Sequence, residues 1–262
     1  MDPFAGMDRA LIDRYLAAQK SPLLFVTVSG AHLYGFASAD SDYDLRGCHV
    51  TPARDVFRLK PPSETVEVMD KSGPVEMDLV THDVHKFFRL LLNNNGYVLE
   101  QVFSPLVCAA APEFEELKAL ARGCITRHHN HHYRAFAKNQ WEMVVKSGKP
   151  TVKGLLYTYR VLLAGIYLLS TGNVESNIVK LNEVYRMPEV DELVALKIGG
   201  AEKQELHGAG LDHHERQYLR LAEQLGRARD ASSLPDEPAA RAGLDDLLVR
   251  LRVQTVAGAT RA

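Results

Sequence analysis

Residues 23–47 read LLFVTVSGAHLYGFASADSDYDLRG, and this stretch decides both the fold and the function that we predict. Residues 23–28 are an uninterrupted apolar, β-branched run, which is typical of a buried strand. The chain then breaks at Gly30, where backbone N–H groups at a strand-to-helix turn could receive a phosphate. Asp42 and Asp44 follow two residues apart, so on an extended chain their side chains point to the same face.

Carboxylates as close as Asp42 and Asp44 repel each other unless a cation lies between them. Oxygen ligands suit Mg²⁺ (or Mn²⁺), which usually takes one or two carboxylates together with phosphate oxygens of a substrate. A short acidic motif is also ordinary loop sequence, and alone it is weak evidence for a metal site. The strand and glycine turn just upstream strengthen the prediction of a metal site beside a nucleotide.

The glycine turn and the acidic motif together resemble the signature of polymerase-β-type nucleotidyltransferases, in which Gly-Ser, a short helix and Asp-x-Asp follow one another. The fuller strings are Ser-Gly-x-His-x-Tyr-Gly at residues 29–35 and Asp-Ser-Asp-x-Asp-x-Arg-Gly at residues 40–47. They are more similar to one branch, the RNA-repair-pathway polymerase-β family of predicted nucleotidyltransferases. The sequence departs from the superfamily at Ala31, where a serine is usual, so a hydroxyl that would help to hold a triphosphate is missing unless Ser29 serves.

A third carboxylate is expected from residues 75–80, VEMDLV, which alternate apolar and acidic residues as a half-buried strand does. The resemblance implies that a neighbouring strand supplies such an acid, and Asp78 matches it, with Glu76 as the second choice. Asp78 would then help to hold metal and accept the proton of an attacking hydroxyl. Without the acidic pair upstream, the same pattern would indicate the solvated face of an edge strand.

Residues 149–160, KPTVKGLLYTYR, supply cations at the start of a long apolar helix. Lys153, Tyr157 and Arg160 are spaced as one stripe of that helix, and two cations with a phenol suit the oxygens of a triphosphate. Cations that extend to solvent from the edge of a helix are the alternative interpretation. The predicted nucleotide-binding residues are Ser29, Gly30, Ala31, Arg46, Lys153, Tyr157 and Arg160. Arg46, two residues beyond Asp44 on the same face, could neutralise the acids or contact phosphate.

A histidine-rich run, HHNHH at residues 128–132, offers a rival metal site. His128 and His132 share a helical face at a spacing that metal ligands use, and His129 lies between them. Zinc would need a third protein ligand, and the sequence contains no H-E-x-x-H motif. A polar helix face is the simpler interpretation of the run.

The composition is that of an ordinary globular protein, with 46% apolar and 24% charged residues. The formal net charge of −2 excludes a global basic field for nucleic acids but leaves local patches possible. The three cysteines follow no metal or disulfide spacing and indicate reduced thiols. We find no secretory signal pattern and no run of about 18 apolar residues, so we expect a cytoplasmic protein without a membrane span.

Strand patterns come early in the chain and helical patterns late, which predicts an α+β fold. We expect a small mixed sheet with flanking helices, the nucleotidyltransferase catalytic domain, at residues 8–108. A helical C-terminal domain at residues 109–255 should follow. Within it, residues 231–240 are rich in Ser, Pro and acids and are expected to form an exposed linker.

The sequence therefore predicts a Mg²⁺-dependent enzyme that transfers a nucleoside monophosphate from an NTP to a hydroxyl and releases pyrophosphate. Asp42, Asp44 and Asp78 would hold two metal ions. The resemblance suggests an RNA or tRNA-like end as acceptor, while a protein or small-molecule acceptor, the NTP and the oligomeric state stay open. A nucleotide-sensing module without turnover, which Ala31 favours, and a histidine-based metallohydrolase are the alternatives.

Overall fold

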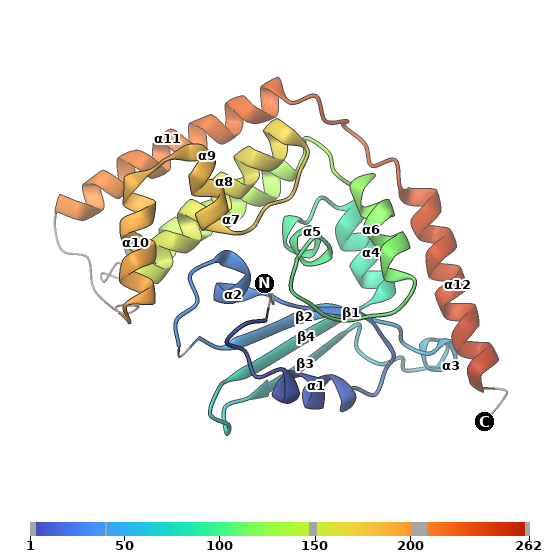
Figure 1. Ribbon diagram of the computed structural model, residues 1–262. Coiled ribbons are helices and arrows are strands. Elements are labelled where there is room, and N and C mark those ends of the chain that lie inside the picture. The colour runs from blue at the N-terminus through green and yellow to red at the C-terminus, as the bar shows by residue number, and fades with distance from the viewer. Residues whose placement is uncertain (1–3, 40, 147–150, 201–208, 260–262) are drawn as a thin grey trace.

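The computed structural model describes residues 4–39, 41–146, 151–200 and 209–259. The prediction of an α+β fold is confirmed: a five-stranded mixed sheet has helices on both faces, and a group of long helices follows it in the chain (Figure 1). The candidate active site lies on the sheet, so the arrangement of the strands determines where its side chains meet.

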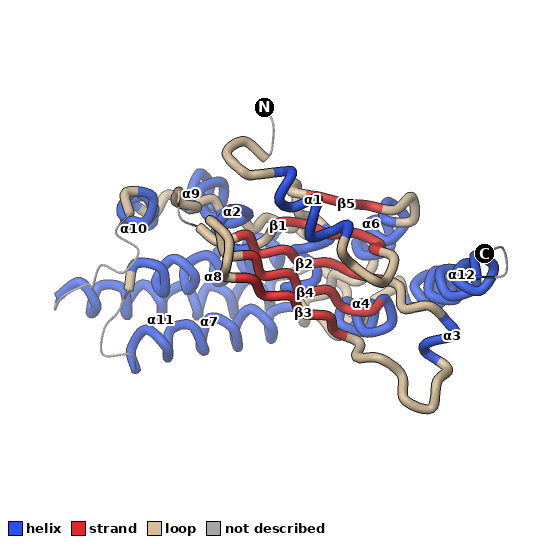
Figure 2. The backbone as a smooth tube through the Cα atoms, turned by 90° about the horizontal axis from the view of Figure 1, so that it is seen from below, coloured by secondary structure: helices blue, strands red, loops and turns tan. Residues whose placement is uncertain are grey.

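The strands lie side by side in the order β3-β4-β2-β1-β5 (Figure 2). Their bounds are Leu23–Val28 for β1, Tyr43–His49 for β2, Thr65–Asp70 for β3, Met77–Asp83 for β4 and Val107–Ala110 for β5. The central pair, β2 and β4, runs parallel, and the other neighbours are antiparallel. In this parallel register Asp44 of β2 is the direct partner of Asp78 of β4.

The edge strand β5 has no signal in the sequence. Its four residues, VCAA, show no alternation of apolar and polar side chains. It forms because one side of β1 offers a free row of backbone groups, and Phe25 and Val26 of β1 pair with Ala110 and Ala109. Backbone pairing of this kind depends on a neighbour that is distant in sequence, so local composition does not reveal it.

Helices cover both faces of the sheet (Figures 1 and 2). Helix α1 lies under one face, and α4, α5 and α6 lie on the other. Their bounds are Arg9–Ala17, Val84–Leu92, Gly96–Val102 and Phe114–Arg122. Tyr43 of β2 faces α1, where its hydroxyl accepts a hydrogen bond from the N–H of Asp8 (2.8 Å). Because side chains alternate along a strand, Asp44 and Arg46 face the other side, towards α5.

The helical group is built around α8, which contacts α7, α9, α10 and α11. Their bounds are Val152–Thr171 for α8, His129–Lys146 for α7, Ile178–Tyr185 for α9, Pro188–Ile198 for α10 and Ala209–Ala231 for α11. Helix α8 is long and apolar enough to cross a membrane by length and composition, but 78% of its most apolar window is buried inside the protein. Its central place among four helices accounts for that composition.

Helix α12 (Arg241–Ala259) leaves the helical group and returns to the sheet (Figure 1). It contacts α3 (Ala53–Val56), α4 and α6. Arg252 fixes it there, since its guanidinium donates to the carboxylate of Asp83 and to the carbonyl of Thr51. Helices α6 and α12 thus pack against the sheet part, although we assigned both to the helical half. The domain boundary near residue 108 stays a prediction.

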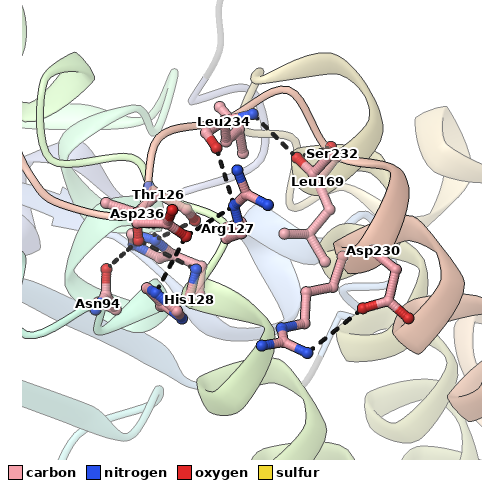
Figure 3. Close-up of polar contacts among 11 residues, drawn as sticks. Asn94, Thr126, Arg127, His128, Leu169, Asp230, Ser232, Leu234 and Asp236 are labelled. Atoms are coloured by element: carbon pink, nitrogen blue, oxygen red, sulfur yellow. Dashed lines mark hydrogen bonds and ion pairs between the residues drawn. The ribbon is translucent and has the colours of Figure 1, made fainter.

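The linker between α11 and α12 is mostly exposed, as expected, but it is fastened at several points (Figure 3). The hydroxyl of Ser232 donates to the carbonyl of Leu169 in α8 (2.7 Å). Arg127 donates from its backbone to Pro235 (3.0 Å) and forms an ion pair with Asp236 (2.9 Å). The path of the chain from the helical group back to the sheet is therefore fixed by polar contacts.

Candidate active site

Carboxylates from the two central strands meet on the sheet face that carries α5. A single guanidinium nitrogen of Arg46, Nη2, lies 3.0 Å from Oδ1 of Asp44 and 2.6 Å from Oδ2 of Asp78. Glu76, the second choice for the third acid, precedes β4 and forms an ion pair with Lys71 (2.7 Å). The structure therefore brings together the strand acids that the predicted mechanism needs, and it favours Asp78 over Glu76.

Asp42 adds a third carboxylate from the loop just before β2, where its side chain is exposed. The pKa of Asp44 is raised, chiefly by burial. Arg46 opposes the rise, while the charges of Asp78 and Asp42 add to it. A partly buried carboxylate whose acidic neighbours disfavour its charge is well placed to bind a cation, because the cation offsets both effects.

The turn before α2 (Gly30–Tyr34) is fitted against Asp44. Gly30 has a φ of +59°, and a Cβ at this position would lie 1.9 Å from Oδ2 of Asp44. Only glycine both adopts this backbone conformation readily and leaves room for the carboxylate. The N–H of Ser29 donates to the carbonyl of Asp44 (2.7 Å), which fixes the turn to β2. Ser29 and Ala31 are both buried, and a contact of this turn with phosphate stays a prediction.

Arg46 uses all five of its N–H donors. Its acceptors are Tyr97 Oη for Nε, the carbonyl oxygens of Leu45 and Asp78 for Nη1, and the carboxylates of Asp44 and Asp78 for Nη2. Tyr97 belongs to α5, so the guanidinium joins that helix to both central strands. Of the two roles that the sequence suggested for Arg46, neutralising the acids and contacting phosphate, the structure shows the first. The contact with Tyr97 was not foreseen, because a tyrosine early in a helix carries no local signal of it.

The first turns of α8 lie near the carboxylates. The pKa of Asp44 is raised by burial, and the charge of Lys153 opposes part of this rise. The pKa of Tyr157 is raised by burial and further by the charge of Asp44. Two of the three residues in the predicted stripe are therefore close to Asp44, although α8 follows β2 by about a hundred residues. Their role in binding triphosphate stays a prediction.

Arg160, the third residue of the stripe, lies elsewhere. Its guanidinium is buried and donates to both carboxylate oxygens of Glu100 in α5, at 3.0 and 2.9 Å. It also lies over the ring of Tyr34, 3.9 Å from the centroid. We predicted a contact with phosphate, but the structure gives Arg160 an internal ion pair that joins α8 to α5. The helical stripe continues into the core, where no solvent reaches the cation.

Lys197 of α10 is a further cation near the loop that precedes the acids. It is 1% exposed, and its Nζ donates to Oγ of Ser38 (2.7 Å) in the loop that leads to Asp42. A lysine in an amphipathic helix is usually solvated, and nothing in its local sequence marked this one as buried. The contact positions the loop before the first acid from the helical group.

The histidine run does not form a metal site among the residues that the structure describes, where no cluster of three His, Cys, Asp or Glu side chains is arranged to hold an ion. His128 lies 3.5 Å from the carboxylate of Asp236 (Figure 3) and its ring stacks on His131. His129 is buried at the start of α7, beside Thr126. His132 stacks on Phe136. The side chains diverge, so the structure does not support the histidine-based metallohydrolase.

His132 instead predicts a pH dependence of stability. Burial, with a smaller effect of the Arg160 charge, lowers its pKa to about 4 from 6.5. A lowered histidine pKa means that the fold favours the neutral ring, so this contribution is complete above pH 6.5 and is lost as the pH falls to about 4. In His132→Phe, which keeps the stacking ring, we expect the free energy of unfolding to fall less over that range.

The measurement is urea unfolding followed by circular dichroism at several pH values between neutrality and pH 4.5. His131→Gln, at an exposed position on the same helix, is the matched control and should follow the wild-type curve. Equal pH dependence of His132→Phe and the wild type would show that His132 does not titrate as its burial implies.

Two cavities, of about 620 and 400 Å³, flank α12. The larger is mainly apolar and includes Phe57, Asp83 and Arg252 in its wall. Both lie at the far end of β2 from the acids, since Thr51 and Val50 line them and Asp44 is near the first residue of that strand. None of the predicted site residues lines either cavity. The converging charged groups, rather than cavity size, therefore mark the candidate site.

Comparison with known proteins gives distant relatives. The chain is 33% identical over 156 residues to the uncharacterized protein MJ0002 of Methanocaldococcus jannaschii, a match that covers 59% of this chain and 63% of that protein. It is 24% identical over 193 residues to the uncharacterized protein YcgL of Bacillus subtilis, covering 70% of this chain and 72% of YcgL. The matched part thus spans less than two thirds of MJ0002.

Among solved structures, a nucleotidyltransferase-like protein from Exiguobacterium sibiricum matches with a TM-score of 0.31 and 13% identity, over 85% of this chain and 73% of that chain. A likeness at that level carries no inference about the site. The match to a family is far more extensive. The model of the RNA repair pathway DNA polymerase beta family matches residues 8–250, which include every candidate site residue, and the chain belongs to this family.

Proposed function

We propose that this protein transfers a nucleoside monophosphate from a nucleoside triphosphate to a hydroxyl acceptor, with release of pyrophosphate. The main observation behind the proposal is that Asp44 and Asp78, on neighbouring parallel strands, lie close together beside the turn at Gly30. Membership of a polymerase-β-type nucleotidyltransferase family supports the reaction class.

The carboxylates fit one Mg²⁺ or Mn²⁺ ion. Asp42 and Asp44 offer hard oxygen donors next to the turn, and such ions commonly use one or two carboxylates together with substrate phosphate oxygens. Between Asp44 and Asp78 the donor set does not fit a second ion, because Nη2 of Arg46 contacts both carboxylates there. When bound, the ion supplies charge neutralisation and polarises the phosphoryl oxygens.

The chain's own residues then position the reactants. The acceptor oxygen forms a bond to the α-phosphorus while the bond from that phosphorus to the pyrophosphate oxygen breaks. The proton of the acceptor hydroxyl passes to Asp78, whose Oδ2 is held by Arg46 and which therefore presents a fixed carboxylate. Lys153 and Tyr157, near Asp44, contact the leaving phosphates, where a cation stabilises the developing charge.

The acceptor that we propose is an RNA or tRNA-like 3′ end, because the family is named for an RNA repair pathway. A hydroxyl of this kind suits Asp78 as proton acceptor without further groups. The oligomeric state and the choice of NTP do not enter the mechanism. We keep the cytoplasmic location predicted from the sequence as part of the proposal.

The test is incubation of the purified chain with each α-³²P-labelled NTP and Mg²⁺, over total RNA and separately over total protein. We expect label on RNA together with stoichiometric pyrophosphate. The double variant Asp42→Ala/Asp44→Ala should abolish both signals. If the label appears only on protein, the acceptor is a protein and not RNA. Transfer that survives the double substitution would contradict the proposed mechanism.

A second function, nucleotide sensing without turnover, has one observation in its favour: Ala31 occupies the position of the usual serine. The same experiment separates the two. Labelled NTP that is retained on gel filtration, with no pyrophosphate over any acceptor, would favour the sensing module.

A further inference from the structure

We propose that Arg46 occupies the place of one of the two metal ions that the predicted mechanism assumed, so that the site holds a single divalent ion at Asp42 and Asp44. This inference rests on the proposed function, and it changes the sequence-based expectation of two ions shared by three acids.

The guanidinium of Arg46 has hydrogen-bond acceptors on all sides. All five N–H groups of Arg46 have acceptors, at distances of 2.5 to 3.0 Å. Two of these acceptors are backbone carbonyls, of Leu45 and Asp78, and the Nε acceptor is the hydroxyl of Tyr97. The side chain is therefore held from three directions and is not displaced at low cost.

The guanidinium of Arg46 also lies between the two strand carboxylates. A Mg²⁺ ion that bridged Asp44 and Asp78 would lie about 2.0–2.1 Å from an oxygen of each. Nη2 of Arg46 already lies 3.0 Å from Oδ1 of Asp44 and 2.6 Å from Oδ2 of Asp78, so it fills the space between these two oxygens. A nitrogen cation and a metal ion cannot share that space, so the bridge is either guanidinium or metal.

The summed charge of Arg46 and the acids also favours a single divalent ion. The three carboxylates carry −3 and Arg46 carries +1, so the group as a whole carries −2, which one divalent ion neutralises. Arginine keeps its charge at every physiological pH, so this fixed cation needs no ion from solution. A guanidinium also binds two acceptors at once in a fixed geometry, which is the bridging role that the second ion has in two-metal sites.

Nη2 of Arg46 lies closer to Asp78 (2.6 Å) than to Asp44 (3.0 Å), so this fixed cation is on the side of Asp78, the proton acceptor, and Asp42 and the Gly30 turn are left for the ion that accompanies the triphosphate. The metal ion would therefore arrive with the nucleotide, whereas the cation beside the acceptor hydroxyl is built into β2. Asp78 is in this arrangement a partner of Arg46 and not a metal ligand.

The experiment counts ions on the full chain with Mn²⁺ and a non-hydrolysable α,β-methylene NTP analogue, by electron paramagnetic resonance of free Mn²⁺. We expect one Mn²⁺ per chain. Asp44→Asn should weaken Mn²⁺ binding by roughly 10–100-fold, the usual cost of disturbing a metal site. Asp78→Asn keeps the shape of the side chain and should change the affinity by less than about threefold, because Asp78 is not a ligand.

Two substitutions of arginine complete the test. Arg46→Ala opens the bridging position and should raise the count to two ions. Arg89→Ala, at an exposed position on α4, should leave it at one. If Arg46→Ala fails to fold, Tyr97→Phe is measured instead. This variant removes one hydrogen-bond acceptor of the Arg46 guanidinium but leaves the guanidinium in place. A count of one Mn²⁺ per chain for Tyr97→Phe then supports the proposal.

The outcomes separate this inference from the proposed function. Two ions on the wild-type chain, or equal weakening by Asp44→Asn and Asp78→Asn, would overturn the role of Arg46 and leave nucleotidyl transfer standing. Absence of any bound ion in the presence of the analogue would overturn both.

Discussion

Replacing Arg160 with methionine is expected to lower the free energy of unfolding by about 3–5 kcal/mol, because it leaves the carboxylate of Glu100 buried without its partner. Both side chains are 3% exposed, and both oxygens of Glu100 accept from Nη1 of Arg160. The substitution also removes the cation that lies over the ring of Tyr34. The pair joins α5, which carries Tyr97, to α8, which carries Lys153, so activity should fall with stability.

A double substitution shows that the unpaired charge is the cause. In Arg160→Met/Glu100→Leu both charges are replaced by apolar groups, and we expect much of the lost stability to return, as replacement of a whole buried ion pair is often neutral. The pKa of Glu100 is already raised by burial. Without Arg160 the carboxyl gains a proton more readily, so the single variant should lose less stability at pH 5 than at pH 8.

Chemical denaturation at both pH values measures these quantities. Arg186→Met is a matched control, since Arg186 is exposed at the end of α9 and its loss should change stability by less than about 0.5 kcal/mol. A single variant as stable as the wild type would mean that the ion pair does not hold the two halves together.

Asp44→Asn is expected to reduce the turnover number of nucleotidyl transfer by at least about 10²–10³-fold while leaving the fold intact. Asparagine keeps an oxygen that can accept from Arg46 and fits the same space under Gly30. It lacks the negative charge that holds the ion. Because the pKa of Asp44 is raised, chiefly by burial, the fold disfavours its charge, and the neutral variant should be at least about as stable as the wild type.

The assay is transfer of label from NTP to RNA, with thermal unfolding measured on the same samples. Asp246→Asn, at an exposed position on α12, is the control and should retain full activity. An Asp44→Asn protein that keeps more than a tenth of the wild-type rate would show that the chemistry does not depend on this carboxylate. Lost activity together with lost folding would point to a structural role instead.

Local sequence was sufficient for much of the candidate site. The resemblance to the family placed Asp78, in the alternating residues 75–80, on a neighbouring strand. The spacing of Asp42 and Asp44 after a glycine turn indicated two acids on one face, and this depends only on the two-residue repeat of an extended chain, which is a property of neighbouring residues. The same holds for the long helix that brings Lys153 and Tyr157 towards the acids.

What the local sequence did not reveal concerns contacts between distant residues. Arg160 belongs to the same helical stripe as Lys153, yet the stripe enters the core and meets Glu100 there. The strand β5 forms only because β1 offers it a partner. The histidine run has metal spacing along the helix, but Phe136, Thr126 and Asp236 engage its side chains in different directions.

By itself, the sequence of this protein indicated the fold class and the shared face of Asp42 and Asp44 through periodicity and spacing, while the resemblance of its motifs indicated the family and the choice of Asp78. Only the tertiary structure decided that Arg46 joins Asp44 to Asp78 and that Arg160 pairs with Glu100. The physical reason is that an arginine pairs with whichever carboxylate lies within hydrogen-bond distance after the helices and strands have packed. That distance depends on the register of β2 with β4 and on the contact of α5 with α8, neither of which is encoded locally.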